Sequence, residues 1–122
     1  MKKMDGAGLA KMQTLEKAQL QLQRVHGLVE QMALAIRSQQ ETAPFRQSIT
    51  RTATPLAGTL KAQFGMIADQ VTSLILVMSR GGGDQARLRA LRELVAQTRT
   101  ALDIAVTKTE QLHTSDSTSP TD

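Results

Sequence analysis

The stretch LEKAQLQLQRVHGLVEQMALAI, residues 15–36, decides the fold class. Its main apolar stripe advances by steps of three and four residues, through Leu15, Ala18, Leu22, Val25, Val29, Met32 and Ile36. Such steps keep the side chains on one side of an α-helix, whereas a half-buried strand needs alternation at every second residue. A repeat close to 3.5 residues further predicts left-handed packing at a shallow angle, as in coiled coils.

Two further stretches repeat this spacing. The second carries Ala53, Ala57, Leu60, Phe64, Ile67, Val71, Leu74 and Met78, and the third carries Leu88, Leu91, Val95, Thr98, Leu102, Ala105, Thr109 and Leu112. Thr42 and Pro44 separate the first stretch from the second, and Gly81-Gly82-Gly83 followed by Asp84 separates the second from the third. The sequence therefore predicts an all-α fold, an antiparallel three-helix bundle of long, coiled-coil-like helices.

Pro55 lies inside the second predicted helix. Because proline lacks an N–H and clashes with the preceding turn, it predicts a kink between Arg51 and Pro55. Alternatively, Thr54 could cap a new helix that starts at Pro55, and Pro44–Ala53 would then be a separate short helix. The pattern leaves both interpretations open.

The length of 122 residues fits one helical-bundle domain, which we assign to residues 1–113. Residues 114–122 contain only Ser, Thr, Asp and Pro, so we expect a disordered C-terminal tail. The chain has no Trp, Tyr or Cys, which leaves a core of aliphatic residues and Met and excludes disulfides and thiolate ligands.

The beginning of the chain carries Lys2 and Lys3, as the charged start of a signal peptide would, but no apolar segment follows them. The longest apolar run, Leu74–Met78, is far shorter than the ~18 residues that cross a bilayer. We therefore expect a cytoplasmic protein without a membrane contact.

Residues capable of catalysis or metal binding are dispersed along the chain. The two histidines, His26 and His113, are far apart, and a structural zinc site normally takes four Cys or His ligands. The Gly81–Gly83 stretch follows a predicted helix and precedes Asp84, so it predicts a turn and not a phosphate-binding loop. The sequence thus predicts no enzyme activity, no catalytic residue, no metal site, no cofactor and no small-molecule ligand.

Apolar residues outside the main stripes indicate a surface for a partner. Leu20, Gly27 and Leu34 are spaced seven apart on the side of the first helix away from its stripe, and glycine permits close approach of another helix. The alternative is that the drift of a straight helix, ~20° per heptad, turns these residues toward the core. The candidate interface comprises Leu20, Gly27, Leu34, Gly58, Gly65, Met66 and Leu76. It predicts a non-enzymatic interaction module that self-associates or binds a helical partner.

The charge balance permits a second function. The chain carries a formal net charge of +4, and an up-down-up bundle would gather Lys11, Arg80, Arg87, Arg89 and Arg92 at one end. This Arg80–Arg92 pole would suit an anionic partner, so the alternative is a small basic nucleic-acid-associated protein that contacts a duplex backbone. The lack of exposed aromatic residues argues against single-stranded nucleic acid, whose bases stack on such side chains.

Overall fold

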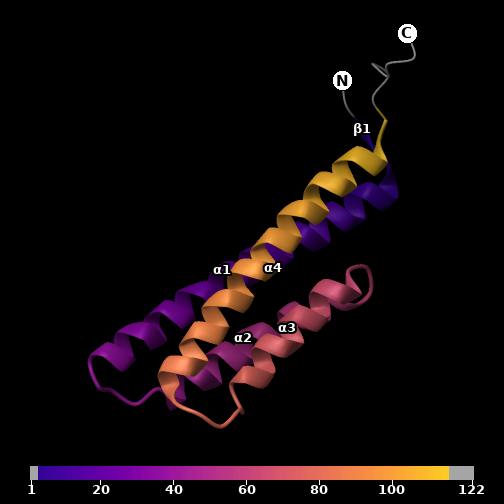
Figure 1. The fold of residues 1–122 in the computed structure, drawn as a ribbon. Helices are drawn as coiled ribbons and strands as arrows, with labels where there is room; N and C mark the ends of the chain where they lie inside the picture. The colour runs from indigo at the N-terminus through magenta and orange to yellow at the C-terminus, as the bar shows by residue number, and fades with distance from the viewer. Residues whose placement is uncertain (1–2, 116–122) are drawn as a thin grey trace.

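The computed structural model describes residues 3–115 and is built almost entirely of α-helices (Figure 1). The elements are β1 (Lys3–Met4), α1 (Gly6–Arg37), α2 (Ala43–Lys61), α3 (Gly65–Val77), α4 (Asp84–His113) and β2 (Thr114–Ser115). The two-residue strands β1 and β2 pair in antiparallel fashion at one end of the molecule. The prediction of an all-α class is confirmed.

The four helices form an antiparallel bundle whose members differ in length. Helix α1 packs against α2 and α4, and α3 also packs against α2 and α4, so α1 and α3 lie on a diagonal. In Figure 1, α1 and α4 lie side by side and extend past the hairpin of α2 and α3 toward β1. We call this extension, residues 6–11 of α1 with residues 110–113 of α4, the stem.

The prediction of three helices is wrong, because the second predicted helix is two antiparallel helices. The chain reverses at Ala62–Phe64, where the Phe64 backbone (φ −137°, ψ 58°) leaves the helical region. The Phe64 carbonyl then accepts from the N–H groups of Ile67 and Ala68, which starts α3. The apolar spacing of three and four residues continues across the reversal, because Leu60, Phe64 and Ile67 all pack toward the core.

Pro55 does not interrupt α2, which runs unbroken from Ala43 to Lys61. The alternative of a separate short helix over Pro44–Ala53 is therefore wrong. Pro55 lies on the exposed side of α2, and its carbonyl accepts a hydrogen bond from the Thr59 hydroxyl at 3.0 Å. A kink at Pro55 stays a prediction.

The predicted stripes form the core with few exceptions. The buried apolar residues include Leu15, Ala18, Leu22, Val25, Val29, Met32, Ala53, Leu60, Val71, Leu74, Met78, Leu88, Leu91, Val95 and Leu102. Ala57, Phe64, Ile67, Ile36 and Ala105 pack against this core while remaining partly exposed. Leu112 is the one stripe residue whose predicted burial is wrong. Its side chain is 77% exposed, because it lies in the stem, where neither α2 nor α3 covers it.

In the stem, the beginning of α1 and the end of α4 pack closely against each other. Gly8 is buried, and a Cβ at that position would collide with His113 and Met4. Thr114 and Ser115, the first two residues of the predicted tail, form β2 and pair with β1. The rest of that predicted tail, residues 116–122, and Lys2 lie outside the described residues.

None of the helices in residues 3–115 combines the length and the apolar character needed to cross a membrane.

Candidate functional site

The outer face of α1 holds an exposed apolar line. Leu20 and Leu34 are 61% and 56% exposed, so neither rotates into the core. Gly27 lies between them, and a Cβ built on it meets no atom within 4 Å. At 3.6 residues per turn these positions lie opposite the buried stripe of α1. We refer to Leu20, Gly27 and Leu34 as the α1 outer line.

Leu9 extends this line and was missed by sequence reasoning. It is 53% exposed and lies three helical turns before Leu20 on the same side of α1. The signal was present in the 11-residue spacing from Leu9 to Leu20, which returns almost to the same helix face.

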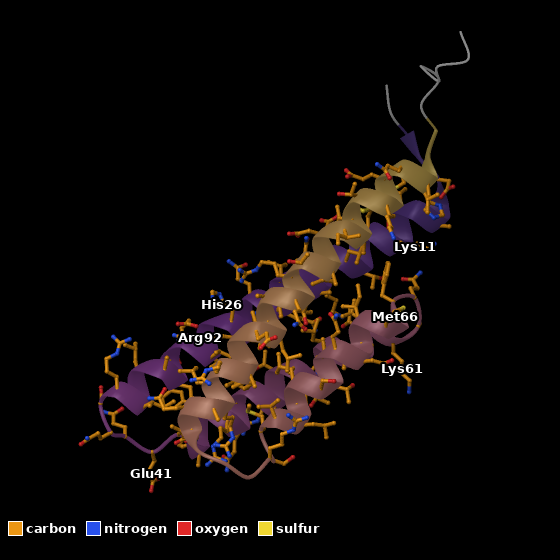
Figure 2. The ribbon with its side chains drawn as sticks, viewed as in Figure 1. Lys11, His26, Glu41, Lys61, Met66 and Arg92 are labelled. Carbon is orange, nitrogen blue, oxygen red and sulfur yellow. The ribbon has the colours of Figure 1, made fainter. Side chains whose placement is uncertain are left out.

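The remaining predicted interface residues belong to other faces. Gly58 is on the outward side of α2, and Gly65, Met66 and Leu76 are exposed on α3, the helix diagonal to α1. Figure 2 shows Met66 and Lys61 at the tip of the α2–α3 hairpin. The structure therefore does not bring the seven residues into one continuous surface.

A second apolar surface, which the sequence did not indicate, lies between α3 and α4. Met66 and Ile67 from α3 face Ala101, Ile104 and Ala105 from α4 across an open groove of about 510 Å³. Ile104 is half exposed there. Only the pairing of α3 with α4 assembles this groove, so periodicity within one helix could not reveal it.

The predicted basic pole is divided between the two ends of the molecule. Lys11 is in the stem, where its Nζ lies 3.1 Å from Nε2 of His113. Arg80, Arg87 and Arg89 are at the opposite end, close to the Gly81–Gly83 turn. The grouping of Lys11 with these arginines is therefore wrong, since α3 runs away from the stem in the four-helix order.

Two of the four arginines in that pole already have protein partners. The Arg87 side chain donates to the Asp84 carboxylate at 2.6 Å and to the backbone carbonyls of Val77, the last residue of α3, and Arg80 in the turn that follows. Arg92 forms a two-point contact with Glu30 at 2.7 and 3.0 Å. The hydrogen bonds from Arg92 lower the pKa of Glu30 and raise that of Arg92.

The turn end nevertheless remains basic. Arg80 and Arg89 are exposed, and the fold adds three arginines that were not part of the predicted pole, namely Arg37, Arg46 and Arg51. Within residues 3–115 none of these five has a carboxylate within 4 Å. We refer to Arg37, Arg46, Arg51, Arg80 and Arg89 as the arginine end.

A row of polar contacts joins α1 to α4. Nδ1 of His26 lies 3.2 Å from the Arg99 guanidinium, and Nε2 of His26 lies 3.9 Å from Glu30. Figure 2 shows His26 and Arg92 on this side of the bundle. The Arg99–His26 and Arg92–Glu30 contacts cross from α4 to α1 and therefore help to hold these two helices together.

The contacts around Asp5 also serve the fold. Asp5 caps α1 by accepting from the Gly8 N–H at 2.6 Å, and its carboxylate lies 3.3 Å from Nδ1 of His113. The Gly8 hydrogen bond lowers the pKa of Asp5, with smaller contributions from His113 and Lys11. In the part of the chain that the structure describes, no group of three His, Asp or Glu residues could hold a metal ion.

No family model matches this sequence, and comparison with curated proteins and with solved structures gave no match either.

Proposed function

We propose that the protein is a non-enzymatic helical interaction module that associates with a second copy of itself through the α1 outer line. The observation that supports this function is the exposure of Leu20 and Leu34 on either side of Gly27. Burying leucine side chains against a partner helix is favourable by roughly 1.5–3 kcal/mol each, and the glycine lets two helix backbones approach closely. A cytoplasmic location belongs to the same proposal.

The arrangement favoured is an antiparallel pair of α1 helices with a two-fold axis beside Gly27. In this pair Leu20 of each copy meets Leu34 of the other, because the two leucines are equally far from Gly27. Glu16 lies near one end of the α1 outer line and Arg37 near the other end, both on the same side of it. Glu16 of one copy would therefore face Arg37 of the other copy across the two-fold axis. A two-fold interface makes this favourable pair twice.

The substitution Gly27→Leu tests the proposal. The added side chain has open space in the single copy, so helicity should be kept or slightly increased. In the pair it would separate the two α1 helices at their closest point, and light scattering should report a fall from dimer to monomer mass. Gly58→Leu is the matched control, since it fills equally open space on α2 and should keep the dimer. A wild-type monomer at high protein concentration would rule out the pair.

A second candidate function is contact with a nucleic-acid duplex through the arginine end. The supporting observation is that five arginines gather there without an acidic partner within the described residues. Backbone contact predicts an affinity that falls steeply with salt and that Arg80→Gln and Arg89→Gln reduce in steps. Duplex binding that is absent, or insensitive to salt, would remove this candidate.

A further inference from the structure

The groove between the start of α2 and the end of α3 has an apolar floor and basic walls. It is open along one side and has a volume of about 570 Å³, which is within the range of small-molecule sites. Ala43, Ile75 and Met78 supply apolar surface, and Gln47, Thr50 and Ser79 supply polar atoms. Arg46 and Arg51 also line the groove, and none of its lining residues is acidic.

A chain of hydrogen bonds positions the Arg46 side chain. Its Nε donates to the Thr42 hydroxyl at 3.3 Å, and that hydroxyl donates to Asp84 at 3.0 Å. Thr42 is only 5% exposed, so the hydroxyl at the centre of this chain of hydrogen bonds is buried. The terminal amino groups of Arg46 make no hydrogen bond to another described residue, which leaves them for a ligand. A fixed guanidinium suits a carboxylate, because its fork matches the two oxygens.

The surrounding negative charge is already neutralised. The Asp84 carboxylate is engaged by Arg87, and the same Arg87 side chain donates to the carbonyl of Val77 at the negative end of α3 and to that of Arg80 in the turn beyond it. Glu41 precedes α2 and does not line the groove. No acidic residue lines the groove, and the carboxylate linked to Arg46 through Thr42, that of Asp84, is already paired with Arg87.

We propose that this groove binds a medium-chain fatty carboxylate. The head group would lie between Arg46 and Arg51, and the alkyl chain would lie on Ile75 and Met78. The groove follows α2 from Ala43 to Arg51, about 12 Å at 1.5 Å per residue, which suits a single chain of moderate length. This site is separate from the α1 outer line, so its failure would leave the proposed dimer untouched.

Calorimetric titration of the full chain with decanoate, below the concentration at which it forms micelles, tests the site. We expect saturable binding of one decanoate per chain. Two control compounds should not bind. Acetate has the carboxylate head group without the alkyl chain, and decyltrimethylammonium has the alkyl chain with a positively charged head group. Binding of the cationic chain as tightly as decanoate, or no binding of decanoate, would overturn the proposal.

Two arginine variants locate the binding. Arg51→Gln and Arg46→Gln should each weaken decanoate binding by about tenfold, because each removes one charged hydrogen-bond partner of the head group. Arg51 is exposed and makes no hydrogen bond to a described residue, so its variant keeps the fold even if Arg46→Gln does not. Arg89→Gln is the matched control, since Arg89 is exposed outside the groove and its loss should leave the affinity unchanged.

NMR spectra of the methionine methyl groups would show where on the protein decanoate binds. Of the six methionines, Met78 lies on the floor of the groove, whereas Met32 is in the core and Met66 is at the hairpin tip. Decanoate should shift the Met78 methyl resonance and leave that of Met66 in place. A larger shift at Met66 would place the ligand in the α3–α4 groove and contradict the proposal.

Discussion

Thr98 is the clearest departure from an apolar core at the scale of single residues. Its side chain is fully buried on α4, and its hydroxyl oxygen has no hydrogen-bond partner among the described residues. Leaving a hydroxyl buried and unpaired costs roughly 1–3 kcal/mol, so this position lowers the stability of the bundle. The stripe of α4 predicted the burial of Thr98, but a one-dimensional pattern could not say whether a partner for the hydroxyl lies nearby.

Thr98→Val should therefore raise the free energy of unfolding by about 1 kcal/mol, because valine has a similar shape and nothing to hydrogen-bond. Chemical denaturation with the same m-value for both proteins would measure the change. Thr107→Val on the exposed side of α4 serves as the control and should alter stability little. A destabilised Thr98→Val protein would show that the hydroxyl has a partner in solution.

At the scale of elements, the sequence predicted some helix ends correctly and missed others. Gly82 has a φ of 112°, the left-handed conformation that the predicted turn between Gly81 and Gly83 requires. Thr42, which separates the first two apolar stretches of the sequence, is the residue before α2, but its hydroxyl donates to Asp84 and does not cap the helix. The reversal at Ala62–Phe64 has one local signal, Gly65 directly after it, but the apolar spacing continues across that glycine and favoured an unbroken helix.

Spin labels at Gln47 and Ser79 would measure this reversal. The two residues line the same groove on adjacent helices, whose axes are typically 8–10 Å apart, so we expect a label separation on the order of 15–20 Å. One unbroken helix would place them about 48 Å apart at 1.5 Å per residue. A pair at Gln13 and Arg37, both on α1, should give about 36 Å and calibrates the scale of a continuous helix.

The N-terminal cap of α1 should respond to acid. The Gly8 hydrogen bond lowers the pKa of Asp5 from its ordinary value of 3.8, so the charged carboxylate stabilises the folded cap. That stabilisation is present above the ordinary pKa and is lost as the pH falls through the lowered one. The Gly8 amide resonance should move with a midpoint below 3.8. Asp5→Asn can still accept the hydrogen bond and should remove the pH dependence.

At the scale of the whole molecule, the four-helix order decides which charges and apolar groups share a surface. It places Arg46 and Arg51 next to Ser79 and the end of α3, and it moves Lys11 to the other end. It also leaves the outer face of α1, with Leu20 and Leu34, exposed, since the main packing partners of α1 are α2 and α4. The arginine end, the groove and the α1 outer line all follow from this order.

Exchange of charges between Glu16 and Arg37 would test the proposed antiparallel dimer. Glu16→Arg alone and Arg37→Glu alone each create like-charge pairs twice, and each should weaken the dimer by a few-fold, about 0.2–1 kcal/mol per lost pair. Mixing the two variants restores opposite charges and should give mainly the mixed dimer by native mass spectrometry. Lys61→Glu at the hairpin tip is the charge-matched control and should change nothing. Equal amounts of mixed and unmixed dimers would contradict the antiparallel arrangement.

The sequence by itself determined the helical class, the buried face of each helix and the turn at Gly81–Gly83. These depend on 3.6-residue periodicity and on the backbone freedom of glycine, which are local properties. Only the tertiary structure decided that the chain reverses after Lys61, because a helix folded back on itself buries the same residues as one that continues. The choice depends on contacts of α3 with α2 and α4, which burial of Leu74 and Val77 stabilises. For the same reason the sequence could find the exposed leucines of α1 but not the groove that Arg46 and Met78 share.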